Sequence, residues 1–357
     1  MAGHRPRFSF TAGSLSADTD SPVGGPLRFV VERSVAVPID SLRVMLAESA
    51  GAAAGDAVTL DLGDEDGLQR VFTGTVAELR PALGGCSLFC TGTMLGLVEL
   101  RVASFYEGRS AGDVVRDLVG QAGLAAGDIS DGLTLPRYAI ERRQGAHAQL
   151  RRLAERLGFS LFADRQGQVH FRGLGPAAQL GSGGLGGGLG AAGGALAGAA
   201  GAAGALAGSG DLAFGKHLLA AQARLRPPPQ RKIVVGGESP MSGQGEDKSF
   251  WLTATDTDFE DSSGSGDEWL ITDAAARTKD MAGRFAAGYA AALAARSAEL
   301  RLTVLGMAAL DLGDDLGASG APEAGLNGRG VITGLRHRLS AREGFVTDVV
   351  IAAGVSE

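Results

Sequence analysis

Apolar and polar residues alternate along two stretches near the two ends of the chain, and this alternation limits the fold more than any other feature. The first stretch, LRFVVERSVAVPIDSLRVMLAE, begins at Leu27, and the second, VITGLRHRLSAREGFVTDVVIAAG, runs from Val331 to Gly354. A period of two places successive side chains on opposite faces of a β-strand, so one face of each strand is expected to be buried. Both ends of the chain are therefore predicted to form antiparallel β units.

The two β units also resemble each other. The tetrapeptide Val-x-Thr-Gly begins at Val71 and again at Val331, 260 residues later, and each time an alternating strand, a polar turn and another alternating strand follow. A second match, Gly-Asp at Gly55 and Gly313, lies 16 and 18 residues before the tetrapeptide and agrees better than a repeated LDLGD does. One β meander used twice is thus predicted, and chance similarity between strands is the alternative that the sequence leaves open.

The period changes to that of a helix in the middle of the chain. Ser110 is placed to cap a helix. The apolar face of this helix would be Val114, Val115, Leu118 and Val119. A second helix is predicted from about Ala146 to Leu157, with Gly158 where a C-terminal cap is expected. The segment FSLFADRQGQVHF, residues 159–171, predicts a hairpin around the turn DRQG. Residues from about 104 to 175 are therefore predicted to form a small α/β module.

The run that follows the module, residues 176–213, is predicted to be a flexible Gly/Ala-rich insertion. No charged residue occurs between Arg172 and Asp211, and almost every residue from 181 to 210 is Gly or Ala. Small residues at regular spacing can bring membrane helices together, but Gly and Ala add little hydrophobic free energy and each interior Gly costs a helix about 1 kcal/mol. A linker is therefore favoured over membrane contact by 181–210.

These patterns divide the chain into five parts. They are an N-terminal extension (1–26), the first β unit (27–103), the module (104–175), the insertion (176–213) and the second β unit (214–357). The second β unit is expected to carry an acidic loop at 243–269 and a long alanine-rich helix at 273–298. The predicted fold class is mainly β with α (α+β).

Charge and cysteine usage restrict the partners and the compartment. The chain has 33 basic and 40 acidic residues, a net charge of −7, so nucleic acid is not expected as a partner. Cys86 and Cys90 would lie roughly 13 Å apart along a strand, which excludes a disulfide, and no second ligand pair follows at zinc-site spacing. Both are predicted to be buried free thiols. The start, MAGHRPRFSF, lacks the apolar segment of a signal peptide, so synthesis in the cytoplasm is expected.

Catalytic motifs are missing from the sequence. It contains no G-x-S-x-G, no H-E-x-x-H and no P-loop. The five histidines are scattered: His4, His147, His170, His217 and His337. Glu141 with Asp164 is an acidic pair of the kind that glycosidases use, although only their separation in space decides that role. No catalytic residue, cofactor or metal is therefore predicted.

One acidic segment, DTDFEDSSGSGD, has part of the pattern of a calcium-binding loop. Every second residue from Asp256 to Glu260 is acidic, but the sixth position is Asp261, where the turn requires Gly, and the twelfth is Asp267 instead of a bidentate Glu. A solvated acidic loop is therefore favoured over a calcium site. The tryptophans that bracket the segment are predicted to pack in a core: Trp251 and Trp269.

Five stretches of the chain, in this order, resemble the baseplate hub proteins of contractile tails. These are the phage late control gene D family and the hub half of VgrG proteins. The stretches are FVVERSVAVPIDSLRVML, GDAV…VFTGTVAEL, FYEGRSAGDVVRDLVGQAGL, LRRLAERLGFSLFADRQGQVHF and GDDL…GVITGLRHRLSAREGFVTDVVI. The resemblance covers the chain from about Leu27 to its end. The Gly/Ala run and the acidic loop depart from the family's pattern, which leaves their roles open.

The resemblance implies a structural role. Each β unit would be a tube-like antiparallel β-barrel, and three subunits would present six barrels. Such a homotrimer can join a six-fold inner tube protein to a three-fold spike within the baseplate of a phage tail or contractile injection particle. Because the chain ends at Glu357, soon after the last strand, the spike is expected to be a separate polypeptide. A peptidoglycan hydrolase built on a β scaffold is the alternative function.

Overall fold

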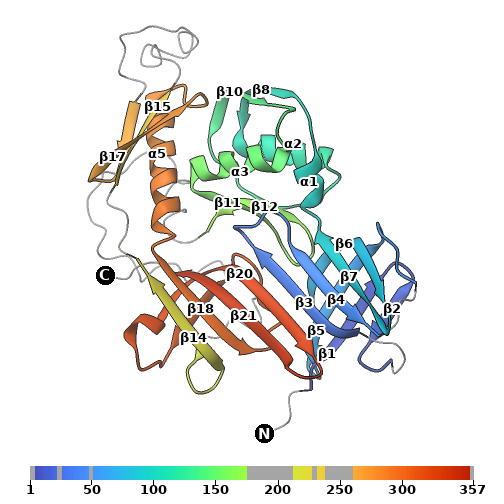
Figure 1. The fold of residues 1–357 in the computed structure, drawn as a ribbon. Helices are drawn as coiled ribbons and strands as arrows, with labels where there is room; N and C mark the ends of the chain where they lie inside the picture. The colour runs from blue at the N-terminus through green and yellow to red at the C-terminus, as the bar shows by residue number, and fades with distance from the viewer. Residues whose placement is uncertain are drawn as a thin grey trace.

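The protein is described by a computed structural model that covers residues 5–21, 26–47, 51–174, 212–226, 231–237 and 260–353. Strands make up most of its regular structure, with a few helices (Figure 1). The predicted class, mainly β with α, is therefore confirmed. Most of the Gly/Ala-rich insertion, with the candidate membrane segment at 181–210, lies outside the described residues, and so does most of the predicted acidic loop.

The elements fall into three groups along the chain. The first group is β1 (Arg7–Ala12), β2 (Leu15–Asp18), β3 (Pro26–Ser34), β4 (Ser41–Leu46), β5 (Ala57–Asp64), β6 (Gly67–Ala82) and β7 (Gly85–Gly92). The module has α1 (Leu95–Glu99), β8 (Ser104–Ser110), α2 (Ala111–Gln121), β9 (Ala126–Ile129), β10 (Thr134–Ile140), α3 (Ala146–Leu157), β11 (Phe159–Ala163) and β12 (Val169–Gly173). The last group is β13 (Leu212–Ala213), β14 (Leu218–Leu225), β15 (Arg231–Gly237), β16 (Glu260–Ser263), β17 (Asp267–Asp273), α5 (Lys279–Ala294), β18 (Ala298–Leu305), β19 (Asp315–Ser319), the short 3₁₀ helix η3 (Ala324–Leu326), β20 (Gly328–Ser340) and β21 (Gly344–Ala353).

The two β units are joined in one 13-stranded sheet. Its main path is β14-β18-β21-β20-β3-β4-β7-β6-β5-β1-β2, and the antiparallel pair of β20 with β3 connects the second unit to the first. Figure 1 shows these strands, from yellow β14 through red β20 to blue β3 and β4, as one curled layer beneath the module. Each half packs over its own apolar cluster, one around Phe10, Phe29 and Leu60 and the other around Leu300, Leu316 and Ile332. The two units predicted from the sequence therefore share one sheet.

The segment predicted as an N-terminal extension contributes to this sheet. Strand β1 pairs with β5 and β2, and Phe10 and Ala12 are fully buried. The ring of Phe10 lies 5.5 Å from that of Phe29 on β3. The alternating residues RFSFTA carry the same period-two signal as the later strands, so residues 7–18 belong structurally to the first β unit.

The two halves repeat one topology. In the first copy, strands β3 to β7 lie in the sheet order β3-β4-β7-β6-β5, and in the second copy β14 and β18 to β21 lie in the order β14-β18-β21-β20-β19. All of these pairs are antiparallel. Strand order and chain order agree between the copies, so the predicted duplication is present in the fold.

The predicted Gly-Asp register is also confirmed. The Gly55 N–H donates a hydrogen bond of 2.8 Å to the carbonyl of Val76, and the Gly313 N–H donates one of 2.9 Å to the carbonyl of Ile332. Both glycines have positive φ, +93° and +83°, a conformation that glycine adopts at little cost. In each copy the next residue, aspartate, accepts a bond from the backbone N–H three residues before it.

The Val-x-Thr-Gly match, by contrast, does not superimpose in the fold. Because Val76 is equivalent to Ile332, the true counterpart of Val331 is Thr75, and the tetrapeptides are displaced by four residues. A bulge follows each of the two equivalent residues. In this register GTVAELRPAL, from Gly74, aligns with GVITGLRHRL, from Gly330, and both read G-x-(V/I)-x-x-L-R-x-x-L.

The module forms as predicted from local signals. Ser110 and Asp113 make a reciprocal capping box at the start of α2, and α3 ends at Gly158, whose φ is +66°. Strands β11 and β12 are an antiparallel hairpin. The second copy carries an insertion between β14 and β18, in which β16 and β17 flank β15 in a small sheet covered by α5.

Two boundaries predicted for this insertion are wrong in detail. The long helix spans Lys279–Ala294 instead of 273–298, because Asp273 ends β17, Thr278 caps the helix and Ala298 begins β18. The acidic segment is not a loop throughout, since its described end forms β16 and the start of β17. Helix α5 also contacts α3 of the module, so the insertion bridges the second copy to the middle of the chain.

Candidate functional site: a strand junction and two free strand edges

The two carboxylates considered as a glycosidase pair lie in different local settings. The Asp164 carboxylate accepts hydrogen bonds from the backbone N–H groups of Gln166 and Gln168 and contacts Nε2 of His170 at 3.1 Å. Burial tends to raise the pKa of Asp164, but the hydrogen bonds from His170 and the turn hold it below its usual value. A general acid needs a raised pKa, so the lowered pKa does not suit Asp164 to that role. Its carboxylate stabilises the β11–β12 turn. Glu141 lies at the end of β10, where its N–H donates to Gln149.

Burial shifts the pKa values of two histidines and one cysteine. Burial, with Arg33 and Arg165 nearby, lowers the pKa of His337 to about 3, and burial lowers that of His147 to about 4. Cys86 and Cys90 are buried free thiols, as predicted, and burial raises the pKa of Cys90 to about 12.

The calcium-loop segment is only partly described. Glu260 and Asp261 lie in β16 and Asp267 begins β17, on opposite sides of β15, so this half is two strands instead of a loop wrapped around an ion. Trp269 on β17 is 44% exposed, beneath the guanidinium of Arg231, and not in a core as predicted. Trp251 lies outside the described residues. No group of three or more His, Cys, Asp or Glu side chains suited to a metal occurs in the described part of the chain.

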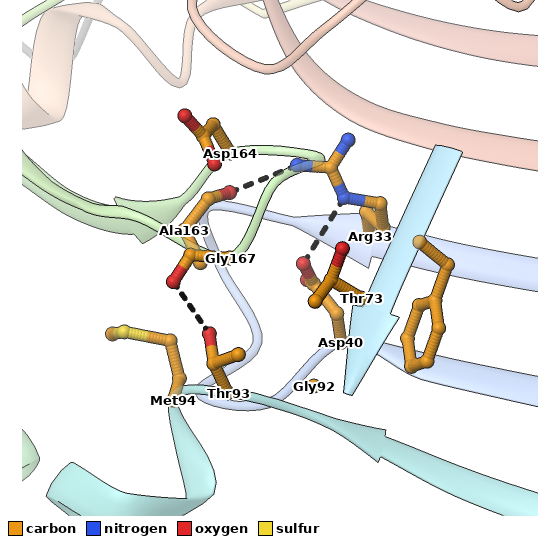
Figure 2. Close-up of a pocket in the computed structure, with 10 residues that line it drawn as sticks. Arg33, Asp40, Thr73, Gly92, Thr93, Met94, Ala163, Asp164 and Gly167 are labelled. Atoms are coloured by element: carbon orange, nitrogen blue, oxygen red, sulfur yellow. Dashed lines mark hydrogen bonds and ion pairs between the residues drawn. The ribbon is translucent and has the colours of Figure 1, made fainter. Parts of the chain in front are cut away.

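A pocket at the centre of the molecule is a packed junction (Figure 2). Its lining includes Arg33 and Asp40 of the first copy and Ala163 and Gly167 of the β11–β12 hairpin. The space inside cannot hold even a water molecule. The Thr93 hydroxyl donates a 2.8 Å hydrogen bond to the carbonyl of Gly167, which ties the hairpin to the end of β7.

Arg33 links all three parts of the chain at this junction. Its side chain is 1% exposed and contacts Asp40 at 3.1 Å and Asp311 of the second copy at 2.7 Å. Its Nη2 also donates a 2.9 Å hydrogen bond to the carbonyl of Ala163 in the module. Burial raises the pKa of Asp40, and the charge of Arg33 offsets only part of this effect. One guanidinium therefore holds the two copies and the module together.

The junction between the copies is a strand pair with a polar and an apolar face. Strand β20, from Gly334 to Ser340, pairs antiparallel with β3. Arg336 lies opposite Glu32 and forms a 3.1 Å ion pair with it on the exposed face. On the other face Leu339 is only 8% exposed and packs in the apolar cluster of the first copy. The second copy thus completes the core of the first.

The two strand edges that meet at this junction, those of β20 and β3, each have a counterpart in the other copy. Neither counterpart is paired along that edge with another described strand. In the first copy, the end of β6 is equivalent to the part of β20 that pairs with β3, yet beyond Val76 it pairs only with β7 among the described strands. In the second copy, β14 is equivalent to β3, and it ends the path of the sheet. The chain therefore presents the two halves of a junction that it already forms once internally.

The exposed apolar residues mark these two edges. Leu83, the first residue after β6 and part of the turn to β7, is the counterpart of Leu339, and it is fully exposed. Leu225 on β14 is 67% exposed. These are the two most exposed large hydrophobic side chains in the described residues. This site was not predicted from the sequence, although the shared motif L-R-x-x-L, which ends at Leu83 and at Leu339, is the signal that could have revealed it.

Among the described residues, no helix combines the length and the hydropathy that a membrane span requires.

Comparison with known proteins shows a likeness in fold at low sequence identity. No family model matches the chain, and no curated protein matches it. Among solved structures, the 43 kDa tail protein of prophage MuSo2 from Shewanella oneidensis has a TM-score of 0.67 at 15% identity, over 97% of this chain and 98% of that one. The tail protein from Neisseria meningitidis MC58 has a TM-score of 0.65 at 13% identity, over 98% and 96%.

A third similar structure comes from a secretion system. It is a component of the type VI secretion system of E. coli, reported to be structurally similar to bacteriophage T4 tail proteins, with a TM-score of 0.54 at 10% identity over 98% of this chain and 77% of that one. The chain shares the fold of these proteins over almost its whole length.

Proposed function

We propose that this chain is a structural hub of a phage tail or a related contractile injection particle. As a homotrimer in the baseplate, it would join a six-fold inner tube protein to a separate three-fold spike, in contact with other baseplate components. The support is the fold shared with tail proteins and with a secretion-system component, together with the duplicated β unit.

The proposed homotrimer rests on one observation. Leu339 is buried where the second copy meets the first, whereas its counterpart Leu83 is fully exposed. An exposed strand edge with a large apolar residue is a site for pairing with another chain. The natural partner of β6 is β14 of a neighbouring subunit, because β14 is the counterpart of the strand that β20 already meets.

The proposed ring would close because the junction within each chain is repeated between chains. Within each chain the second copy joins the first through β20 and β3, and between chains the first copy would join the second through β6 and β14. A head-to-tail contact gives a closed ring when its rotation divides a full turn, and otherwise an open fibre. Three chains with two copies each give six similar units, which matches a six-fold tube on one side and a three-fold spike on the other.

Light scattering of the purified protein, alone and with its candidate spike, tests this function. One chain weighs 36.1 kDa, so the ring is expected at about 108 kDa, either alone or once spike is added. A trimer that captures the spike supports the hub. A monomer under both conditions would refute it.

The hub is proposed to be non-enzymatic. The carboxylate of Asp164 is bound into a turn, and the similar structures are named as tail proteins or as a secretion-system component. Zymography on purified cell wall checks this point, since no clearing is expected. Lysis by the purified chain would instead support the hydrolase alternative.

A further inference from the structure

The face of the sheet opposite the apolar clusters is rich in arginine. We call it the arginine face and define it by seven strand residues: Arg28, Arg43, Arg80, Arg224, Arg301, Arg336 and Arg338. They lie on β3, β4, β6, β14, β18 and β20, and they share one side of the sheet because the strand registers place them in neighbouring rows. The acidic strand residues on the same stretch of this face are Glu32, Glu78, Glu299 and Asp348. The face is therefore net positive in a chain whose net charge is −7.

Two positions of this face carry arginine in both copies. Arg43 on β4 corresponds to Arg301 on β18, since each follows the buried leucine that faces the same position of the next strand. Arg80 on β6 corresponds to Arg336 on β20 within the shared motif. The copies differ at most other exposed strand positions, so the retained arginines point to a requirement on this face and not on the core.

Several of the arginines are free to bind another molecule. Arg336, Arg301 and Arg80 each have an acidic neighbour within 3.1 Å. Arg28 and Arg224 form no ion pair with any described residue, and the guanidinium of Arg43 lies 5.9 Å from the ring centre of Phe89 without an acidic partner in the described ranges. Exposed guanidinium groups recognise carboxylates with paired, directional hydrogen bonds.

Apolar side chains lie between these arginines. Across neighbouring strands, one row of the face reads Arg338, Val30, Arg43 and Phe89. Met45, two residues from Arg43 on β4, is 50% exposed, and Leu305 on β18 is 45% exposed. A phosphate backbone has no apolar group that could pack on the Met45 thioether or on Leu305. The overall negative charge of the chain also opposes the binding of a long polyanion. A polypeptide can supply carboxylates for the arginines and apolar side chains for Met45 and Leu305 at the same time.

We propose that the arginine face is a docking surface for an acidic polypeptide segment that also carries apolar side chains. Carboxylates of the segment bind Arg28 and Arg43, and its apolar side chains pack on Met45 and Phe89. The surface is present on a single chain and does not depend on the ring. A monomer that binds such a segment would refute the proposed hub and still support this inference.

Fluorescence anisotropy with labelled peptides tests the docking surface. The probes are a peptide with glutamate and leucine in a ratio of two to one, the same peptide with lysine in place of glutamate, and a short duplex DNA. The purified protein is expected to bind the acidic peptide most tightly. Replacing the two arginines that bind the carboxylates, Arg28→Ser with Arg43→Ser, should weaken this binding by about two- to fivefold for each arginine removed.

A control variant removes two exposed arginines from elsewhere on the molecule. Arg116 on α2 and Arg284 on α5 are 43% and 42% exposed and lie off the arginine face, so Arg116→Ser with Arg284→Ser should leave the affinity unchanged. Melting temperatures check that both double variants fold. Equal losses in the two variants, no binding of the acidic peptide, or DNA bound as tightly through the same arginines would each overturn the proposal.

Discussion

Nη1 of Arg33 donates a hydrogen bond of 2.7 Å to Oδ1 of Asp311, although 278 residues separate them in the sequence. The contact lies where β3 of the first copy meets the loop before β19 of the second. Asp311 also accepts a hydrogen bond from the Arg165 backbone N–H. One buried ionic cluster therefore helps to fix the orientation of the two copies and of the module, together with the β20–β3 strand pair.

Removal of Arg33 should be strongly destabilising. The substitution Arg33→Met leaves Asp40, whose side chain is 12% exposed, without its ion-pair partner, and leaves Asp311, 14% exposed, with only the more distant Arg165 at 3.7 Å. Loss of one partner of a buried ion pair costs about 3–5 kcal/mol of unfolding free energy, and urea denaturation measures it. The matched control is Arg336→Met, which breaks an exposed pair in the same strand pair and should cost less than about 1 kcal/mol. Similar losses in both variants would show that Arg33 does not link the two copies.

Stability should fall in mild acid partly because of His337. Burial lowers its folded-state pKa to about 3, below the value of about 6.5 in an unfolded chain. Between these values the unfolded state binds the proton and the folded state does not, so stability declines as the pH falls below about 6.5. From pH 7.5 to pH 5 the His337 contribution is about 2 kcal/mol.

Urea titrations at the two pH values measure this effect in the wild type and in His337→Gln. The variant should lose less stability on acidification, whatever its stability at pH 7.5. His147, with a lowered pKa of about 4, acts in the same window, so a smaller pH dependence should remain. An unchanged pH dependence in the variant would contradict the prediction.

The same substitution at two glycines should have opposite effects. A Cβ atom at Gly288 on α5 would lie 2.2 Å from the Arg156 carbonyl on α3, whereas one at Gly120 on α2 meets no atom within 4 Å. Gly288→Ala should therefore destabilise the protein by about 1–3 kcal/mol, because the two helices must separate. Gly120→Ala should stabilise it by up to about 1 kcal/mol. Thermal melts of both variants give the signs, and a stabilised Gly288→Ala would argue against close packing of α3 and α5.

Cysteine cross-linking can test the register of the proposed ring. Arg338 lies opposite Val30 in the internal junction, and their counterparts are Ala82 on β6 and Gln222 on β14. The double variant Ala82→Cys with Gln222→Cys should form disulfides between chains, because directly opposed strand residues are close enough to bridge. Non-reducing gels should show a ladder that stops at three chains.

The control for this experiment is a register four residues away. Ala82→Cys with Arg226→Cys should cross-link poorly, while the buried native thiols stay unreacted. A ladder that extends past three would indicate an open fibre. Cross-linking that is equal in both variants would mean that no fixed strand register exists.

Local signals predicted much of the fold but not the junction. The ends of α3, the cap at Ser110 and the Gly-Asp turns depend on neighbouring residues, so the sequence predicts them well. The joining of the two units into one sheet depends on contacts between distant strands. One signal was available, because Arg33 lies two residues after Val31 on the buried face of β3, where the alternation requires an apolar residue. A charge at such a position implies partners that the sequence alone does not identify.

The insertion in the second copy shows where this scaffold tolerates added chain. A connection of a few residues, 35–40, joins the first two strands of the first copy, whereas residues 226–297 occupy the same place in the second copy and leave the strand order unchanged. Val37, at the tip of the shorter connection, is 55% exposed. That tip is consequently the position at which a reporter domain or an affinity handle can be grafted with least disturbance to the sheet.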